Sequence, residues 1–239
     1  MSKLFDFSSL AMIPTAYKDG KLYSVRPTDG SGDFTFSRGS NLAATRVASS
    51  GYIEKGRENL LTYSNELDGA DWSATRLTST PVQGAQGYDG SNDAWTITPN
   101  ATFGTHYINV GSWSATSGVF TISVYAKANG YDYLSIRDAA SNNTYALFEL
   151  DSGSTSMNGG AAIESTITSV GNDWYKCTFT LNRTAGGSNN LIFYVNDVNT
   201  TYVANYSGDT TSGILLQDAQ AEQGLVATDY IETGASTAQ

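Results

Sequence analysis

The chain has 239 residues, of which 40% are hydrophobic and 15% charged, and its formal net charge at pH 7 is −10. An acidic surface repels nucleic-acid phosphates and anionic membranes, so we expect neither nucleic acid nor membrane insertion. No stretch approaches the roughly 20 apolar residues that a membrane-spanning helix needs. An aromatic content of 12% argues against a disordered chain.

Residues 1–58 hold few apolar side chains between many turn signals, among them Pro27-Thr-Asp-Gly30. Short strands are predicted between these turns, at Lys21–Val25, Asp33–Ser37 and Thr45–Val47. Because this segment cannot fill a core of its own, we predict an extended N-terminal arm. Such an arm gains its burial by docking on other proteins or on sister subunits, so we expect a homo-oligomer, with a trimer favoured. The alternative is that these strands lie on the same sandwich as the rest of the chain.

From Asn59 onward, strand-like segments alternate with Gly- and Asn-rich turns, and no helical period is evident. Alternation of apolar and polar residues is clearest in Phe120–Ala126, which gives a strand one buried face. We therefore predict an all-β fold, an antiparallel two-sheet jelly-roll sandwich over residues 59–233, followed by a flexible tail at 234–239. The predicted strands are Trp72–Ser79, Ala94–Thr98, Thr105–Val110, Val119–Ala128, Tyr133–Asp138, Thr144–Leu150, Ala161–Val170, Asp173–Leu181, Leu191–Val195 and Gly213–Gln220.

Several segments carry a resemblance to a known group of modules. Asn59–Asn65 looks like an opening strand of that group, Phe120–Ala128 like its central strand, and Ala219–Gly224 with Asp229–Thr233 like its closing motif. Phe148–Asp151 and Val170–Phe179 resemble two further signatures. The chain thus resembles the jelly-roll modules of bacteriophage virion proteins, which are similar to carbohydrate-binding modules. It departs from their commoner pattern at Gln217-Asp218, where an aromatic residue and a glycine are frequent.

This resemblance implies a structural protein of a phage head or tail, such as a fibre, spike or decoration subunit. Its sandwich would adhere to host-surface glycans, and its arm would contact other virion proteins. Phe34–Ser40 and Ile53–Gly56 resemble a leader that often precedes the module. Met1–Phe5 shows no signal-peptide pattern, and a single cysteine, Cys177, fits a reducing cytoplasm, so we expect synthesis in the host cytoplasm and incorporation into the virion. A purely architectural protein and a polysaccharide depolymerase fragment remain as alternatives.

Sugar rings bind to flat aromatic faces, and their hydroxyls bond to carboxylates and amides at the rim. Five aromatic residues lie in or beside predicted loops, and we take them as candidates for glycan binding: Tyr88, Tyr107, Trp113, Tyr131 and Tyr133. Three other aromatic residues fall within the motif strands and are expected in the core: Trp72, Trp95 and Trp174.

A structural calcium ion is the one cofactor that the resemblance suggests. Carbohydrate-binding modules often hold Ca²⁺ where their first and last strands meet, and Glu66, Asp68 and Asp218 could supply oxygen ligands there. The alternative is that these carboxylates are solvated edge charges. Asp89–Asp93 resembles part of a calcium loop but lacks its closing Glu, which favours an ordinary turn.

Catalysis finds little support in the sequence, so we predict that the protein is not an enzyme. His106 is the one histidine, and a lone histidine on a strand is most often a surface or satisfied residue. Cys177 lies mid-strand among bulky neighbours, which suits packing. Glu149 and Asp151 share a strand face, but their place at a strand end favours a turn over a pair of catalytic carboxylates.

Overall fold

The structure is a computed structural model that describes residues 8–18, 21–35, 45–47, 53–55, 58–111, 117–140, 144–183 and 190–237. The chain divides into two units, Met1–Gly56 and Arg57–Gln239. In these described ranges the secondary structure consists of strands, and none contains a helix that could span a membrane.

In the first unit, β1 (Ala11–Lys18), β2 (Lys21–Arg26) and β3 (Phe34–Thr35) form an antiparallel sheet in that order. The short strands β4 (Thr45–Val47) and β5 (Ile53–Lys55) form a hairpin. The Asp33 carboxylate stabilises β2. It accepts a hydrogen bond from the Ser24 amide at 2.8 Å and forms an ion pair with Lys21 at 3.0 Å. β1 was not predicted, since its sequence does not alternate between apolar and polar residues.

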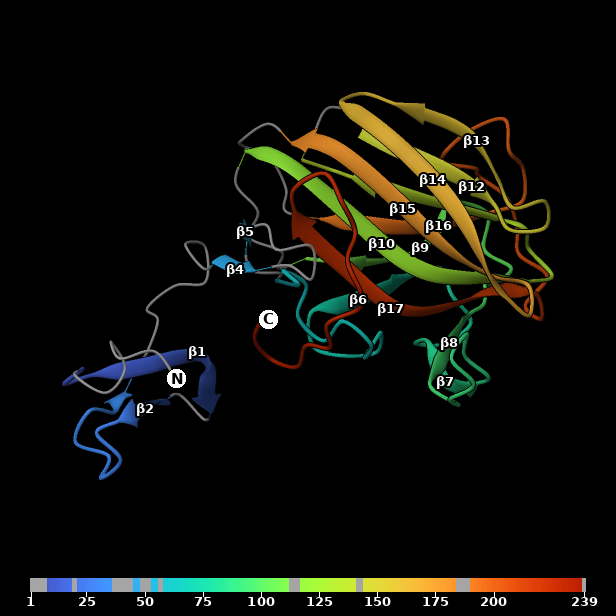
Figure 1. The fold of residues 1–239 in the computed structure, drawn as a ribbon. Coiled ribbons are helices and arrows are strands. Elements are labelled where there is room, and N and C mark those ends of the chain that lie inside the picture. Colours follow the sequence, from blue (N-terminus) through green and yellow to red (C-terminus); the bar gives the residue numbers. More distant parts are fainter. Residues whose placement is uncertain are drawn as a thin grey trace. The chain divides into compact units, whose positions relative to one another are not determined.

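The second unit is a β-sandwich with two six-stranded sheets (Figure 1). Sheet I has the order β14-β15-β10-β17-β8-β7. Its strands are β14 (Ala162–Gly171), β15 (Trp174–Arg183), β10 (Gly118–Asn129), β17 (Gly213–Gln223), β8 (Ala94–Ile97) and β7 (Val82–Ala85).

Sheet II has the order β13-β12-β11-β16-β9-β6. Its strands are β13 (Ser154–Gly159), β12 (Thr144–Glu149), β11 (Tyr133–Asp138), β16 (Leu191–Asn196), β9 (His106–Val110) and β6 (Trp72–Thr75). All pairings within the two sheets are antiparallel, so the predicted all-β jelly-roll sandwich is confirmed.

The core lies between the two sheets, where alternate residues of each strand point inward. On β10 the inward side chains are Phe120, Ile122, Val124 and Ala126, all fully or almost fully buried. Cys177 on β15 is buried among them, as predicted. Trp72 and Trp95 belong to this core, whereas Trp174 is buried outside it, with its ring edge against Tyr88 at 6.5 Å between centroids.

Two strands and one opening segment differ from the prediction. β7 and β13 were not predicted, because their Gly, Ser and Asn residues are typical of turns. Asn59–Asn65 was expected to open the sandwich as a strand, but its backbone meets β17 at two separate points and turns between them. The Leu60 amide donates to the Ala221 carbonyl, and the Ala219 amide donates to the Ser64 carbonyl. This segment instead receives the C-terminal tail: the Tyr63 and Ser64 amides donate to the Gly234 and Thr233 carbonyls.

Candidate functional site

A bulge in β17 places two polar side chains side by side on the outer face of sheet I. Ser123 of β10 pairs with Gln220, and Tyr125 pairs with Gln217, so Asp218 and Ala219 both lie opposite Val124. Asp218 has a φ of 56°, in the left-handed region that non-glycine residues seldom adopt. The extra residue resets the alternation, so Ala219 points into the core while Gln217 and Asp218 point away from it.

Gln217 holds the loop between β7 and β8 against this face. Its side-chain carbonyl accepts a hydrogen bond from the Tyr88 amide at 3.1 Å, and its Nε2 donates to Asp93 Oδ1 at 2.7 Å. Asp89 closes the loop by accepting hydrogen bonds from the amide and hydroxyl of Ser91. The turn predicted for Asp89–Asp93 is therefore confirmed, and Tyr88 is carried over β10, where its ring stacks on Tyr125 at 3.6 Å between centroids.

The C-terminal tail supplies the opposite side of the site. After Gly224, which has a φ of 130°, the chain turns back over β17 (red in Figure 1). Glu222 accepts hydrogen bonds from the amide and hydroxyl of Thr228, and Gln220 Oε1 accepts one from the Ile231 amide at 2.7 Å. Tyr230 is fixed by a 2.6 Å hydrogen bond between its hydroxyl and that of Ser64.

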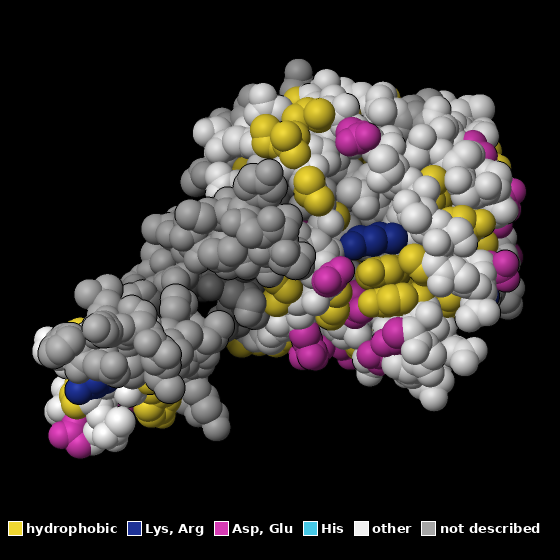
Figure 2. Space-filling view, in the orientation of Figure 1, with side chains coloured by type: hydrophobic (Ala, Val, Ile, Leu, Met, Phe, Trp, Pro, Cys, Tyr) yellow, Lys and Arg dark blue, Asp and Glu magenta, His cyan; other side chains and the backbone are white. Residues whose placement is uncertain are grey.

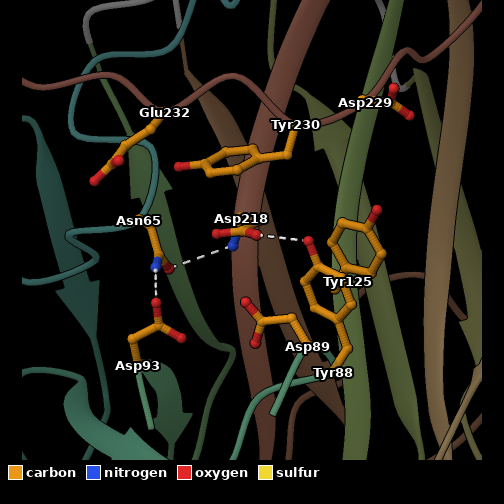
Figure 3. Close-up of a pocket in the computed structure, with 9 residues that line it drawn as sticks. All are labelled: Asn65, Tyr88, Asp89, Asp93, Tyr125, Asp218, Asp229, Tyr230 and Glu232. Atoms are coloured by element: carbon orange, nitrogen blue, oxygen red, sulfur yellow. Dashed lines mark hydrogen bonds between the residues drawn. The ribbon is translucent and has the colours of Figure 1, made fainter. Parts of the chain in front are cut away.

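These three segments enclose a pocket of about 480 Å³ (Figure 3). Its volume lies within the range of small-molecule sites. Asp218 lies in the middle, between Tyr230 on one side and the stacked Tyr88 and Tyr125 on the other. The lining consists of Asn65, Tyr88, Asp89, Asp93, Tyr125, Asp218, Asp229, Tyr230 and Glu232.

Electrostatic repulsion and burial act together on Asp218, which is only 6% exposed. Burial, reinforced by the charges of Asp93, Asp89 and Glu232, raises the pKa of Asp218 to about 7, although a 2.9 Å hydrogen bond from the Tyr88 hydroxyl opposes the shift. Burial likewise raises the pKa values of Tyr88, Tyr125 and Tyr230, so their hydroxyls stay protonated and can donate.

The surface around the pocket also combines acidic and hydrophobic side chains (Figure 2). Figure 2 shows acidic side chains around a hydrophobic patch over β17, with a basic side chain beside it. Lys176 on β15 lies 5.6 Å from the centroid of the Tyr125 ring and donates a 2.8 Å hydrogen bond to the Thr228 carbonyl. It therefore links the tail to sheet I without lining the pocket.

Of the four aromatic residues predicted for glycan binding that the structure describes, only Tyr88 lines this pocket. Tyr107 lies on β9 in sheet II, and its ring centroid is 5.1 Å from that of Tyr194. Tyr131 packs against Tyr206 with 5.4 Å between ring centroids, and Tyr133 is the first residue of β11. Trp113 lies outside the described residues.

Sheet II carries its own group of rings on its outer face. Besides the Tyr107–Tyr194 pair, Tyr145 stacks on Tyr202 at 3.8 Å, and the Arg137 guanidinium lies 6.0 Å from the Tyr202 ring. Tyr194 is only 4% exposed, the other three rings are half-buried, and none of the four lines the pocket on sheet I. The pocket on sheet I is the better candidate site.

The three proposed calcium ligands do not meet. Asp218 lines the pocket, whereas Glu66 and Asp68 are exposed and lie outside its lining. In the part of the chain that the structure describes, no three His, Cys, Asp or Glu side chains are grouped as a metal site requires.

The residues considered for catalysis are occupied elsewhere. His106 is fully buried, and its two ring nitrogens lie 2.6 Å from the Arg76 carbonyl and 3.0 Å from the Tyr206 carbonyl, so it is the satisfied residue that the sequence suggested. Burial raises the pKa of Cys177 far above its usual value. Glu149 accepts hydrogen bonds from Ser156, Asn199, Ser152 and Ser154, and these lower its pKa, the bond from Ser156 most of all.

Most of the pocket was missed at the level of sequence. Asn65, Tyr125, Asp229 and Tyr230 lie in segments that resemble structural motifs, and Asp93 lies in a segment that was interpreted as an ordinary turn. The signal that could have found the site is the departure at Gln217-Asp218, because those two residues build the bulge and hold the loop.

No family model matches the chain, and neither does any curated protein. Solved structures with a similar arrangement include the CBM22-1 xylan-binding domain of Paenibacillus barcinonensis Xyn10C, at 16% identity and a TM-score of 0.41 over 73% of this chain and 99% of that one. TmCBM61, solved with β-1,4-galactotriose, shows 8% identity and a TM-score of 0.38 over 70% and 99% of the two chains. The carbohydrate esterase vb_24B_21 of Shiga toxin-encoding bacteriophage phi24B shows 15% identity and a TM-score of 0.37 over 71% and 100%. These proteins are two carbohydrate-binding modules and a phage carbohydrate esterase.

Proposed function

We propose that this chain is a non-enzymatic virion protein of a bacteriophage whose sandwich binds glycans in the pocket on sheet I. The observation that carries the binding function is a hollow of about 480 Å³ that combines tyrosine rings with a rim of hydrogen-bonding groups. The virion setting rests on the sequence resemblance of residues 34–56 and 59–233.

The chemistry of the lining suits a saccharide. Tyr88, Tyr125 and Tyr230 offer apolar ring surface to the C–H groups of a sugar and hydroxyls to its oxygens. Asn65 adds a planar amide, and the carboxylates accept hydrogen bonds from sugar hydroxyls on several sides. A ligand with many hydroxyls around a flat ring would use more of these groups than a purely apolar one.

The surroundings of His106 and Cys177 support the binding of a glycan without its chemical conversion. Both nitrogens of His106 face backbone carbonyls, so this residue cannot serve as a general base for a serine. Cys177 is fully buried and held as a thiol, so it cannot act as a nucleophile.

The first unit would attach the sandwich to the virion or to sister subunits, and the bound glycans would be those of the host surface. A protein whose sandwich is only architectural is the alternative, and it predicts no glycan binding at all.

The test uses the full-length protein on a glycan array, followed by titration calorimetry with the glycans that bind. We expect Tyr88→Ala to weaken binding about tenfold, because an aromatic ring contact contributes roughly 0.5–1.5 kcal/mol beyond the area that it buries. Tyr107→Ala, on the opposite sheet, is the matched control and should bind normally.

Three results would contradict the proposal. Loss of binding in Tyr107→Ala but not in Tyr88→Ala would move the site to sheet II. Release of sugar or acetate from a bound glycan would make the protein an enzyme. No binding to any glycan would favour the architectural role.

A further inference from the structure

The pocket carries more negative charge than the binding of a neutral sugar requires. Five carboxylates line it, and none of the described lining residues is a Lys or Arg: the acidic residues are Asp89, Asp93, Asp218, Asp229 and Glu232. Lys176 is nearby, but its ammonium is directed to the Thr228 carbonyl at 2.8 Å. An occupant of the cavity therefore meets a strongly negative potential, which favours a cation.

Asp218 supplies a second, independent indication. Its side chain is only 6% exposed, and Oδ2 accepts the Tyr88 hydroxyl at 2.9 Å. Its other oxygen, Oδ1, accepts no hydrogen bond from the residues that the structure describes and is open to the cavity that the residue lines. A donor that enters with the ligand can therefore bond to Oδ1, and a charged N–H group would make the strongest hydrogen bond to it.

The spacing of the carboxylates favours an organic cation over a metal ion. Among the described residues no three of them are grouped closely enough to coordinate one ion. They are instead spread around the cavity, on the loop with Asp89, on β17 and on the tail with Asp229 and Glu232 (Figure 3). Acceptors distributed in this way match a ligand that presents donors in several directions, and the tyrosine rings add attraction for an ammonium group.

We propose that the pocket selects a saccharide that carries a free, protonated amino group, that is, an unacetylated hexosamine unit, over neutral and acidic sugars. This inference rests on the proposed function and specifies its ligand. A lysine side chain carries the same ammonium, but it lacks the ring and hydroxyls that would use the remaining acceptors.

The test is titration calorimetry of the full-length protein with three hexasaccharides of equal length: β-1,4-linked glucosamine, its fully N-acetylated form, and β-1,4-linked glucose. The glucosamine oligomer should bind at least about tenfold more tightly than either of the others, as expected for one charge-assisted hydrogen bond. Its affinity should fall when the salt concentration is raised from 0.1 to 1 M, because salt screens the carboxylates.

Two variants separate the pocket from the general acidity of the chain. Asp218→Asn should lower the affinity for the glucosamine oligomer about tenfold, and by a clearly larger factor than it lowers the affinity for the glucose oligomer. Asp151→Asn removes an equal charge from an exposed position outside the pocket and should change neither. Near-ultraviolet circular dichroism would verify that each variant keeps the native packing around its tyrosines.

The outcomes distinguish this inference from the function on which it rests. If the neutral or acetylated oligomer binds as well as the glucosamine oligomer, and Tyr88→Ala abolishes that binding, the glycan site stands and its selectivity for amines is overturned. If none of the three binds, and no glycan on the array does, both proposals fall. Equal binding of trilysine would overturn the saccharide class, and displacement of the oligomer by millimolar Ca²⁺ alone would identify a metal site instead.

Discussion

Asp218 makes the free energy of unfolding decrease as pH rises, which is the opposite of what most aspartates do. Burial and neighbouring carboxylates raise its pKa to about 7 in the folded chain, whereas an aspartate in an unfolded chain titrates at about 3.9. Between these values the folded state binds one proton more than the unfolded state. The contribution of Asp218 to the free energy of unfolding is therefore largest at low pH and is lost as pH rises through about 7.

We expect this contribution to fall by roughly 1–3 kcal/mol between pH 5 and pH 8. The measurement is urea denaturation of the wild type and of Asp218→Asn at both values. Subtracting the two removes the effect of carboxylates whose pKa is lowered, such as Asp89 and Asp209, because both proteins share them. An equal change of stability with pH in the two proteins would show that Asp218 is already ionised in the folded chain.

Most residues of the pocket could not be assigned to one site from sequence patterns, because what joins them is their position in space. Tyr125 alternates correctly with the core residues of β10, yet nothing in that pattern says that Tyr88 stacks on it. Tyr88 itself was predicted, since an aromatic residue in a Gly-rich loop is exposed unless another element covers it. Tyr107 satisfied the same criterion, but it packs against Tyr194 of a strand that is distant in sequence.

At the scale of the elements, the loop between β7 and β8 depends on a glycine at its entry. A Cβ on Gly87 would lie 2.2 Å from Gln217 Oε1 and 2.9 Å from Asp89 Oδ1. Gln217 cannot simply move away, because its amide bonds to the Tyr88 amide and to Asp93. We expect Gly87→Ala to destabilise the domain by about 1–3 kcal/mol and to weaken ligand binding, since Tyr88 follows directly.

Thermal unfolding and calorimetry would measure the two effects. Gly234→Ala is the control, because a Cβ there meets no atom within 4 Å. A Gly87→Ala protein with unchanged stability would mean that the Gln217 side chain does not hold the loop in solution.

The two strands of the sandwich that sequence analysis missed, β7 and β13, both lie at sheet edges. β10, β15 and β17 occupy the middle of sheet I, where one face packs on the core and produces clear alternation. β7 and β13 are edge strands with a single neighbour, so their Gly, Ser and Asn residues follow no burial pattern. Pairing with β8 and β12 imposes the extended conformation on them, which is a tertiary effect that local propensity does not report.

For the whole molecule, the division into Met1–Gly56 and Arg57–Gln239 allows the predicted oligomerisation to be tested directly. If the first unit joins the subunits, the full chain should have a solution mass near three times 25.4 kDa, while residues 57–239 alone should be monomeric and keep the thermal stability of the sandwich. Light scattering coupled to size-exclusion chromatography measures both masses. A monomeric full chain would refute the trimer, and a trimeric fragment would place the contact on the sandwich.

The position of β17 determines what happens to a shortened chain. This strand comes last in the sequence, yet it is inserted between β10 and β8 near the centre of its sheet. A product that ends before Gly213 therefore leaves the long edge of β10 and the short edge of β8 open, and exposed edges pair readily with other chains. Nonsense mutations or proteolysis in this region should accordingly yield insoluble material and not a smaller, weakly active protein.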